Sequence, residues 1–327
     1  MTTAHAREGN QQWAQGQVDA ALRSFQKGLA LEPQDVDCLL GLVRCHGAQG
    51  AHAAAEASAR RLLALRPDHA EGQARLALAR ARQGDAEALE ALRALAAAPS
   101  AGFGERFELA LLLLERADAA GAEVALRLAL ERDPDSGPAH FERGRLALAR
   151  QDGEAAFAHL ARAAELTRDE PMVLLFLGRA HALRGELGRA LAVVGRAAAA
   201  APASAPLREE LLRLALAAGH PEAAVRAARE LRALTPGSAH AVYLEGLAQL
   251  ASGQFPQAAE LLQEAVSQGL PTALARTEAQ LALARALGGQ GQQGEARALL
   301  ERVLAEGAAG SAQLEAQART LLGQLSG

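Results

Sequence analysis

Residues 16–33 read GQVDAALRSFQKGLALEP, and residues 185–202 read GELGRALAVVGRAAAAAP. Both stretches begin with Gly, place an Ala-Leu pair at the sixth and seventh positions, and end on Pro. Between these positions, apolar residues recur at the spacing of one face of an α-helix. The return of the same pattern so far along the chain predicts an internal repeat.

The spacing of the prolines gives the length of this repeat. Prolines stand 34 residues apart, or twice 34, in three pairs: Pro33 and Pro67, Pro134 and Pro202, and Pro202 and Pro236. Pro99 divides the interval between Pro67 and Pro134 into 32 and 35 residues, and Arg168 stands where a further proline is expected. A fixed period in this range predicts an array of supersecondary units rather than one globular domain.

Each unit is predicted to contain two α-helices joined by a turn. Within residues 137–168, HFERGRLALAR has helical apolar spacing, residues 151–153 break it, and EAAFAHLARAAEL forms a second helix. Glycine supplies the backbone angles that such a turn needs, and it occurs there at Gly16, Gly50, Gly84, Gly185, Gly219 and Gly253. Half of the chain is apolar but only 3% is aromatic, so Ala and Leu dominate. Because both residues favour helices, we expect an almost purely helical protein.

This pattern resembles the tetratricopeptide repeat family, whose 34-residue unit has a small residue in its first helix, two in its second helix and a closing proline. The first small residue of the second helix is Ala in most units, at Ala21, Ala55, Ala122, Ala156, Ala190, Ala224, Ala258 and Ala296. The small residue of the first helix is Gly at Gly9, Gly144, Gly178 and Gly246. The resemblance implies an all-α fold, a right-handed α-solenoid (superhelix) of about nine helical hairpins plus a C-terminal capping helix.

We expect a single solenoid domain over residues 1–327. The predicted repeats are residues 2–35, 36–69, 70–102, 103–136, 137–170, 171–204, 205–238, 239–272 and 277–310, and the capping helix covers residues 311–325. The third repeat is degenerate in its second helix, and four extra residues precede Thr277 in the last one. With an N-terminal Met and a C-terminal cap, we expect the chain to be complete.

Composition and charge argue against several classes of protein. A net charge of −4 provides no overall cationic surface for nucleic acid. No uncharged stretch approaches the roughly 20 apolar residues of a membrane-spanning helix, and MTTAHAREGNQQW at the N-terminus lacks the apolar core of a secretory signal. Cys38 and Cys45 lie two helical turns apart, about 10 Å, which is too far for a disulfide. We therefore expect a cytoplasmic protein.

Two features that suggest chemistry have plainer interpretations. GQGQQG at residues 289–294 matches a dinucleotide-binding pattern, but it lies between two predicted helices, so we interpret it as a lengthened Gly-rich turn. His46 does not share a helix face with Cys38 and Cys45, so we interpret the cysteines as buried free thiols rather than metal ligands. No catalytic motif occurs, and we predict no enzymatic activity, no cofactor and no metal.

Residues 34 apart occupy equivalent places in successive units and form columns along the array. One first-helix column contains Phe107, Phe141, Leu175, Glu209 and Tyr243. The column four residues later contains Leu111, Arg145, Arg179, Arg213 and Leu247, and Arg44 and Arg285 join it once the irregular units are allowed for. Residues four apart lie on one face of a helix, so the sequence predicts an apolar column beside an Arg column.

In tetratricopeptide repeats these first-helix positions line a concave groove that holds partner peptides, and the resemblance implies such a groove here. The predicted groove residues are Phe107, Phe141, Arg145, Leu175, Phe176, Arg179, Arg213, Tyr243 and Arg44. Aromatic and Arg side chains dominate the energetics of many interfaces. The alternative is that the aromatic residues pack between adjacent helices while the arginines pair with Glu108, Glu142 and Glu210.

The leading functional prediction is a non-catalytic protein–protein interaction module: an adaptor, scaffold or assembly factor. Its expected partner is a peptide or helix segment with apolar and acidic residues, without nucleic acid or membrane insertion. Two alternatives stay open, a self-associating structural protein that forms homo-oligomers and a regulator or subunit of an enzyme complex. The dicarboxylate clamp of chaperone adaptors is not expected, because it uses several Lys and Asn residues and this chain has only Lys27 and Asn10.

Overall fold

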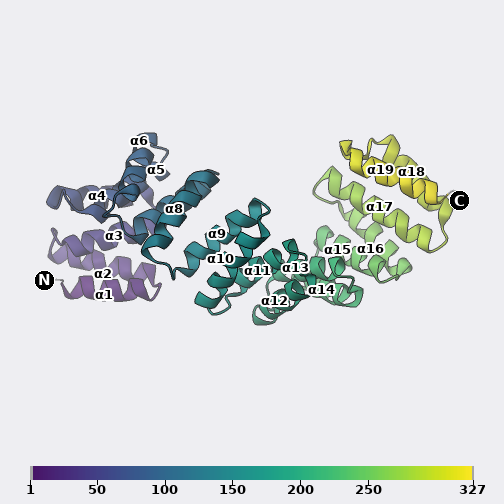
Figure 1. Cartoon of the computed structure of the whole chain (residues 1–327), viewed down its shortest axis with the longest axis horizontal. Coiled ribbons are helices and arrows are strands. Elements are labelled where there is room, and N and C mark those ends of the chain that lie inside the picture. Colours follow the sequence, from purple (N-terminus) through teal and green to yellow (C-terminus); the bar gives the residue numbers. More distant parts are fainter. Residues whose placement is uncertain (1–2, 326–327) are drawn as a thin grey trace. The chain divides into compact units, whose positions relative to one another are not determined.

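The computed structural model describes residues 3–325, which form nineteen α-helices and one short 3-10 helix (Figure 1). Residue 2, where the first predicted repeat begins, lies outside the described residues. The first eighteen helices form nine consecutive pairs, and a three-residue turn joins the two helices of each pair. This arrangement confirms the predicted all-α fold of helical hairpins.

The chain forms two compact units, Met1–Leu146 and Ala147–Gly327, whose boundary falls inside a helix. The first unit contains α1 (Ala4–Ala14), α2 (Val18–Leu31), α3 (Val36–Ala48), α4 (His52–Leu65), α5 (Ala70–Arg82), α6 (Ala86–Ala97), α7 (Phe103–Glu115), α8 (Ala119–Arg132) and most of α9 (Gly137–Ala149). The second unit contains the end of α9 and α10 (Gly153–Leu166), α11 (Pro171–Leu183), α12 (Leu187–Ala200), α13 (Ala205–Ala217), α14 (Pro221–Leu234), α15 (Ala239–Ala251), α16 (Phe255–Gln268), α17 (Ala273–Gly289), α18 (Gln293–Ala305), η1 (Ala308–Gly310) and α19 (Ala312–Gln324). The division of the chain into repeats of one domain stays a prediction.

Within each unit the odd-numbered helices, which are the first helices of the pairs, pack in a row. In the first unit α1, α3, α5 and α7 each contact the next, and α2, α4 and α6 pack between consecutive members of this row. In the second unit the row runs through α11, α13, α15 and α17, and α19 packs on α17 and α18. We call the exposed surface of the odd-numbered helices of a unit its first-helix surface.

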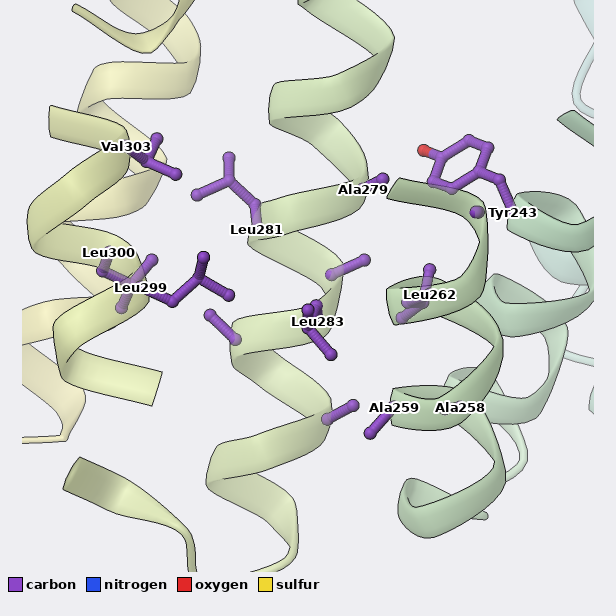
Figure 2. Close-up of a cluster of buried hydrophobic side chains, with 14 of the residues drawn as sticks. Tyr243, Ala258, Ala259, Leu262, Ala279, Leu281, Leu283, Leu299, Leu300 and Val303 are labelled. Atoms are coloured by element: carbon purple, nitrogen blue, oxygen red, sulfur yellow. The ribbon is translucent and has the colours of Figure 1, made fainter. Parts of the chain in front are cut away.

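The core consists mainly of small residues that let neighbouring helices approach closely. All eight alanines of the predicted second-helix column are at most 2% exposed. At Gly178 a β-carbon would lie 2.3 Å from the Cγ2 atom of Val194, so only glycine fits beside that side chain. Leucines fill the remaining space, as in the cluster of Leu262, Leu283 and Leu300 from α16, α17 and α18 (Figure 2).

The predicted turn glycines have the expected backbone conformation. Gly16, Gly50, Gly84, Gly185, Gly219 and Gly253 all have φ between 71° and 97°. Ala117 and Gln151 take the same left-handed conformation at two further hairpin turns, with φ of 59° and 60°. Packing of the hairpins therefore imposes this conformation even where no glycine relieves the steric cost.

The Gly-rich segment at residues 289–294 lies at the turn between α17 and α18, but the prediction of a lengthened turn is wrong. The turn covers only residues 290–292, as in the other hairpins, with Gly291 at φ 82°. Gly289 is the last residue of α17, where a β-carbon would lie 2.6 Å from the Phe255 ring. The missing side chain thus lets the aromatic ring pack on the end of the helix.

The structure shows how the degenerate third unit and the lengthened last unit are accommodated. The second helix of the degenerate third unit, α6, has 12 residues, and the buried Arg106 of α7 donates hydrogen bonds to the carbonyl oxygens of Ala96 and Ala98 near its end. The four extra residues 273–276 form an added first turn of α17, which reaches 17 residues. The chain therefore absorbs a shortened and a lengthened unit without losing the paired arrangement.

Candidate functional site

In the first unit, three of the predicted groove residues lie on α7 and α9. Phe107 is half-buried and stacks on Phe103, with ring centroids 5.2 Å apart. Phe141 is also half-buried, and the Arg145 guanidinium carbon lies 5.7 Å from its ring centroid. Arg145 also donates hydrogen bonds of 2.9 and 3.1 Å to Glu142. The predicted pairing of Glu142 with an arginine of the column is confirmed.

Arg44, the fourth groove residue of this unit, belongs to a chain of alternating charges. It donates two hydrogen bonds, of 2.6 and 2.8 Å, from α3 to the Glu71 carboxylate on α5. Burial by itself raises the pKa of Glu71, but the hydrogen bond and charge of Arg44, with the charge of Arg75, hold this pKa below its usual value. The ion pairs continue in the order Arg44, Glu71, Arg75, Glu108, Arg82 and Glu115. Because three carboxylates face three guanidinium groups, this chain of ion pairs has no net charge.

This chain of ion pairs borders a cavity of about 210 Å³ on the first-helix surface of the first unit. The cavity is lined by Trp13, Val43, Arg44, Arg75, Arg82 and Glu108, among others. The sequence columns missed Arg75, Arg82 and Trp13. These side chains stand at other positions of their helices than the two columns, and Glu108 pairs with Arg75 and Arg82 instead of with a column arginine.

In the second unit, two predicted groove residues are buried. Leu175 is 2% exposed, and Tyr243 is 9% exposed in the cluster that includes Leu262 and Leu281 (Figure 2). Burial raises the pKa of the Tyr243 phenol to about 12. These two side chains therefore pack between adjacent helices, as the alternative interpretation of the column predicts, and do not line a groove.

The other predicted groove residues of this unit lie around the carboxylate of Glu210. We call Phe176, Arg179, Glu210 and Arg213 the Glu210 cluster. The Arg179 guanidinium carbon lies 5.1 Å from the Phe176 ring centroid, and Arg179 donates hydrogen bonds of 3.0 and 3.1 Å to Glu210. Arg213 donates to the other oxygen of the same carboxylate. The predicted pairing of Glu210 with column arginines is confirmed.

The Glu210 cluster differs from the ion pairs of the first unit in its charge. Two guanidinium groups share one carboxylate, so the cluster has an excess of one positive charge. Glu210 is only 3% exposed, whereas the side chains of Arg179 and Arg213 are 40% and 64% exposed. The excess charge therefore faces solvent next to an aromatic ring.

The residues considered for other chemistry are packed as plain structural groups. Cys38 and Cys45 are buried free thiols, as predicted, and burial raises the pKa of each to about 11. Among residues 3–325, no three His, Cys, Asp or Glu side chains are grouped so as to hold a metal ion. Within the same residues, no helix has the length and apolar character needed to cross a bilayer.

Two family models match the chain, and both are described as tetratricopeptide repeat. They cover residues 12–79 and 210–273, one in each unit. The chain is a tetratricopeptide repeat protein. The predicted family is therefore confirmed, and the paired hairpins are those of a tetratricopeptide-repeat superhelix.

Several solved structures share the fold. A tetratricopeptide repeat protein from Parabacteroides merdae ATCC 43184 is 18% identical over 77% of this chain and 98% of its own, with a TM-score of 0.51. PilW, a type IV pilus biogenesis factor, is 18% identical over 63% of this chain and 94% of its own, with a TM-score of 0.51. One chain in the structure of the APC/C hetero-tetramer Cut9–Hcn1 is 17% identical over 93% of this chain and 58% of its own, with a TM-score of 0.53. No curated protein sequence matches the chain.

Proposed function

We propose that this tetratricopeptide repeat protein is a non-catalytic interaction module that binds a partner segment containing apolar and acidic residues. The proposed binding site is the first-helix surface of the second unit, centred on the Glu210 cluster. Tetratricopeptide repeat proteins are generally protein-interaction modules, and no enzyme family matches the chain. The free thiols of Cys38 and Cys45 are compatible with a reducing compartment, and we propose the cytoplasm as the location.

The observation that carries this proposal is the shared carboxylate of Glu210. A guanidinium group has five N–H donors in a planar fork, and one shared carboxylate does not use all the donors of two such groups. A carboxylate of the partner would take the free donors and compensate the excess charge. The half-buried ring of Phe176 offers an apolar contact beside it, and aromatic and Arg side chains are the usual anchors of interfaces.

The pair of Phe141 and Arg145 offers similar chemistry in the first unit. Its arginine lies over an aromatic ring as Arg179 does, and its side chain is 48% exposed. Arg145, however, pairs with Glu142 on its own helix, and Arg44 lies in a chain of ion pairs without net charge. We therefore expect the second unit to contribute more of the affinity for an acidic segment.

Selection from a random library of 12-residue peptides against the immobilised full chain tests this function. The selected peptides should be enriched in acidic residues beside apolar ones. The variant Arg213→Gln keeps the Arg179–Glu210 hydrogen bonds, so the fold is preserved, and it should bind a selected peptide about fivefold more weakly. Arg226→Gln, at an exposed position of the second helix α14, is the matched control and should bind normally. Equal affinities of the two variants, with unchanged helicity, would exclude the Glu210 cluster as the binding site.

A further inference from the structure

A second cavity, of about 330 Å³, lies in the second unit where α19 approaches α15 and α17. Three of its apolar side chains come from three helices: Leu247 from α15, Leu281 from α17 and Leu314 from α19. The ring of Tyr243 forms a further part of the wall. The volume falls within the range of about 300–1,000 Å³ that is typical of ligand sites.

The added first turn of α17 contributes to this cavity. Leu274 lies in that turn, lines the cavity and is 47% exposed. The four inserted residues thus place the side chain of Leu274 at the cavity, and no neighbouring residue buries it fully. An incoming apolar group would bury Leu274 and contact the half-buried Leu247, since Leu281 and Leu314 are already only 2% and 6% exposed.

Two opposite charges face the same cavity. Glu278 and Arg285 both line it, and they lie seven residues apart on α17, about 10 Å along a helix that rises ~1.5 Å per residue. Within the part of the chain that the structure describes, neither side chain forms an ion pair or a hydrogen bond. Both charges act on the Tyr243 phenol, where Glu278 raises the pKa and Arg285 lowers it, after the larger effect of burial.

We propose that this cavity binds an extended peptide segment in which an acidic and a basic residue stand three positions apart, with an apolar residue between them. A polyproline II segment rises about 3.1 Å per residue and brings residues three apart to the same side, so two such charges are about 9 Å apart. The acidic residue then pairs with Arg285, the basic residue with Glu278, and the apolar side chain contacts Leu247 and Leu274. The proposal rests on the proposed function, since it takes the partner to be a peptide segment.

The pair of opposite charges is the distinguishing feature of this site. The Glu210 cluster attracts a carboxylate through excess positive charge, whereas this cavity has one charge of each sign and no net charge. A segment that satisfies both charges in one direction places two like-charge contacts in the other. The cavity should therefore recognise a segment with one charge of each sign, whatever its net charge.

Three fluorescein-labelled peptides test the proposal by fluorescence anisotropy with the full chain. Between identical Gly-Ser flanks they contain Glu-Leu-Ser-Lys, Lys-Leu-Ser-Glu, or Gln-Leu-Ser-Gln. The wild-type chain should bind both charged peptides about fivefold more tightly than the Gln peptide, each in the direction that places its Glu on Arg285. In the variant Glu278→Gln/Arg285→Gln, which keeps the net charge, the charged peptides should lose this advantage.

Equal binding of the three peptides by the wild-type chain, or an undiminished advantage of the charged peptides in the double variant, would overturn the proposal. Both residues are exposed, so the double substitution should leave the circular dichroism spectrum unchanged. If the double variant unfolds, Arg285→Gln serves instead and should reduce the advantage of the charged peptides. The variant Arg213→Gln distinguishes this proposal from the proposed function. It should weaken binding of the library-selected peptide and leave binding of these three peptides unchanged.

Discussion

The carboxylate of Glu210 on α13 joins two first helices, because it accepts hydrogen bonds of 3.0 and 3.1 Å from the guanidinium of Arg179 on α11. This carboxylate is 3% exposed and also accepts a hydrogen bond from Arg213 on its own helix. One buried acid therefore both holds neighbouring hairpins together and orients the two arginines of the proposed binding surface.

Replacing Glu210 by Gln should lower the free energy of unfolding by about 1–2 kcal/mol, because the charge-assisted hydrogen bonds become weaker while the arginines stay hydrated. Urea unfolding followed by circular dichroism measures the change. Glu209→Gln is the matched control: its side chain is 51% exposed and lies 3.5 Å from His240, so the loss should stay below about 0.5 kcal/mol. Equal losses in the two variants would show that the Glu210 carboxylate does not join the helices.

The close approach of α11 and α12 at Gly178 predicts an unfavourable Gly178→Ala substitution. Alanine normally stabilises a helix relative to glycine by roughly 1 kcal/mol, but here its β-carbon would lie 2.3 Å from Val194. Overpacking of this kind costs about 1–3 kcal/mol. Gly195→Ala, on α12, has no atom within 4 Å of the new β-carbon and should be neutral or stabilising. In a thermal-unfolding comparison, the cost of Gly178→Ala should shrink in a Val194→Ala background, and an unchanged cost would contradict the packing.

Arg106 should be essential for the degenerate third unit. It is 5% exposed and donates hydrogen bonds to the carbonyl oxygens of Ala96, Ala98 and Leu128. Arg106→Met keeps most of the side-chain volume but removes all three hydrogen bonds, which should cost about 2–4 kcal/mol. Hydrogen exchange should speed up first in α6, and the exposed Arg127→Met should behave as wild type. A variant as stable as wild type would show that water replaces the guanidinium.

Glu71 should make the stability of the first unit depend on pH. The hydrogen bond and charge of Arg44 hold its pKa below the ordinary value of 4.5, against the opposing effect of burial. The unfolded chain therefore takes up the proton at a higher pH than the folded chain does, so stability is lost as the pH falls below about 4.5. Urea unfolding between pH 7 and pH 3 should show a smaller loss for Glu71→Gln than for wild type. Two parallel curves would contradict the role of the pair.

The fold followed from the sequence because each hairpin packs on its immediate neighbours. The second-helix alanines recur at the repeat spacing, and all of them are buried, since any larger side chain would separate the helices. The glycines at six of the turns likewise predicted where those hairpins turn. Ala117 and Gln151 gave no such signal, because at these turns packing rather than residue type sets the backbone conformation.

Only part of the candidate site could be predicted from the sequence. A column assigns the same helical position to Leu175 and to Phe141, yet Leu175 is buried and Phe141 is half-buried, because exposure depends on the helices packed beside each one. The partners of the arginines depend on which way long side chains extend across neighbouring helices. The bond from Arg44 to Glu71 therefore spans 27 residues and that from Arg179 to Glu210 spans 31, and no fixed period predicts both.

The sequence did not predict the cavity beside α19, for a related reason. The sequence places Arg285 in the Arg column and predicts a capping helix after the last repeat. It contains no signal for how α19 lies against α17, and that packing creates the cavity. The added turn of α17 was visible as an insertion, but its position at the cavity wall depends on tertiary contacts.

Amide hydrogen exchange of the full chain, with and without a library-selected peptide, locates the bound segment directly. If the first-helix surface of the second unit holds the partner, exchange should slow in α11 and α13, around Phe176 and Arg213, and stay unchanged in the second helices α10, α12 and α14. Slower exchange confined to those second helices, or no change in α11 and α13 while the peptide is bound, would contradict this site.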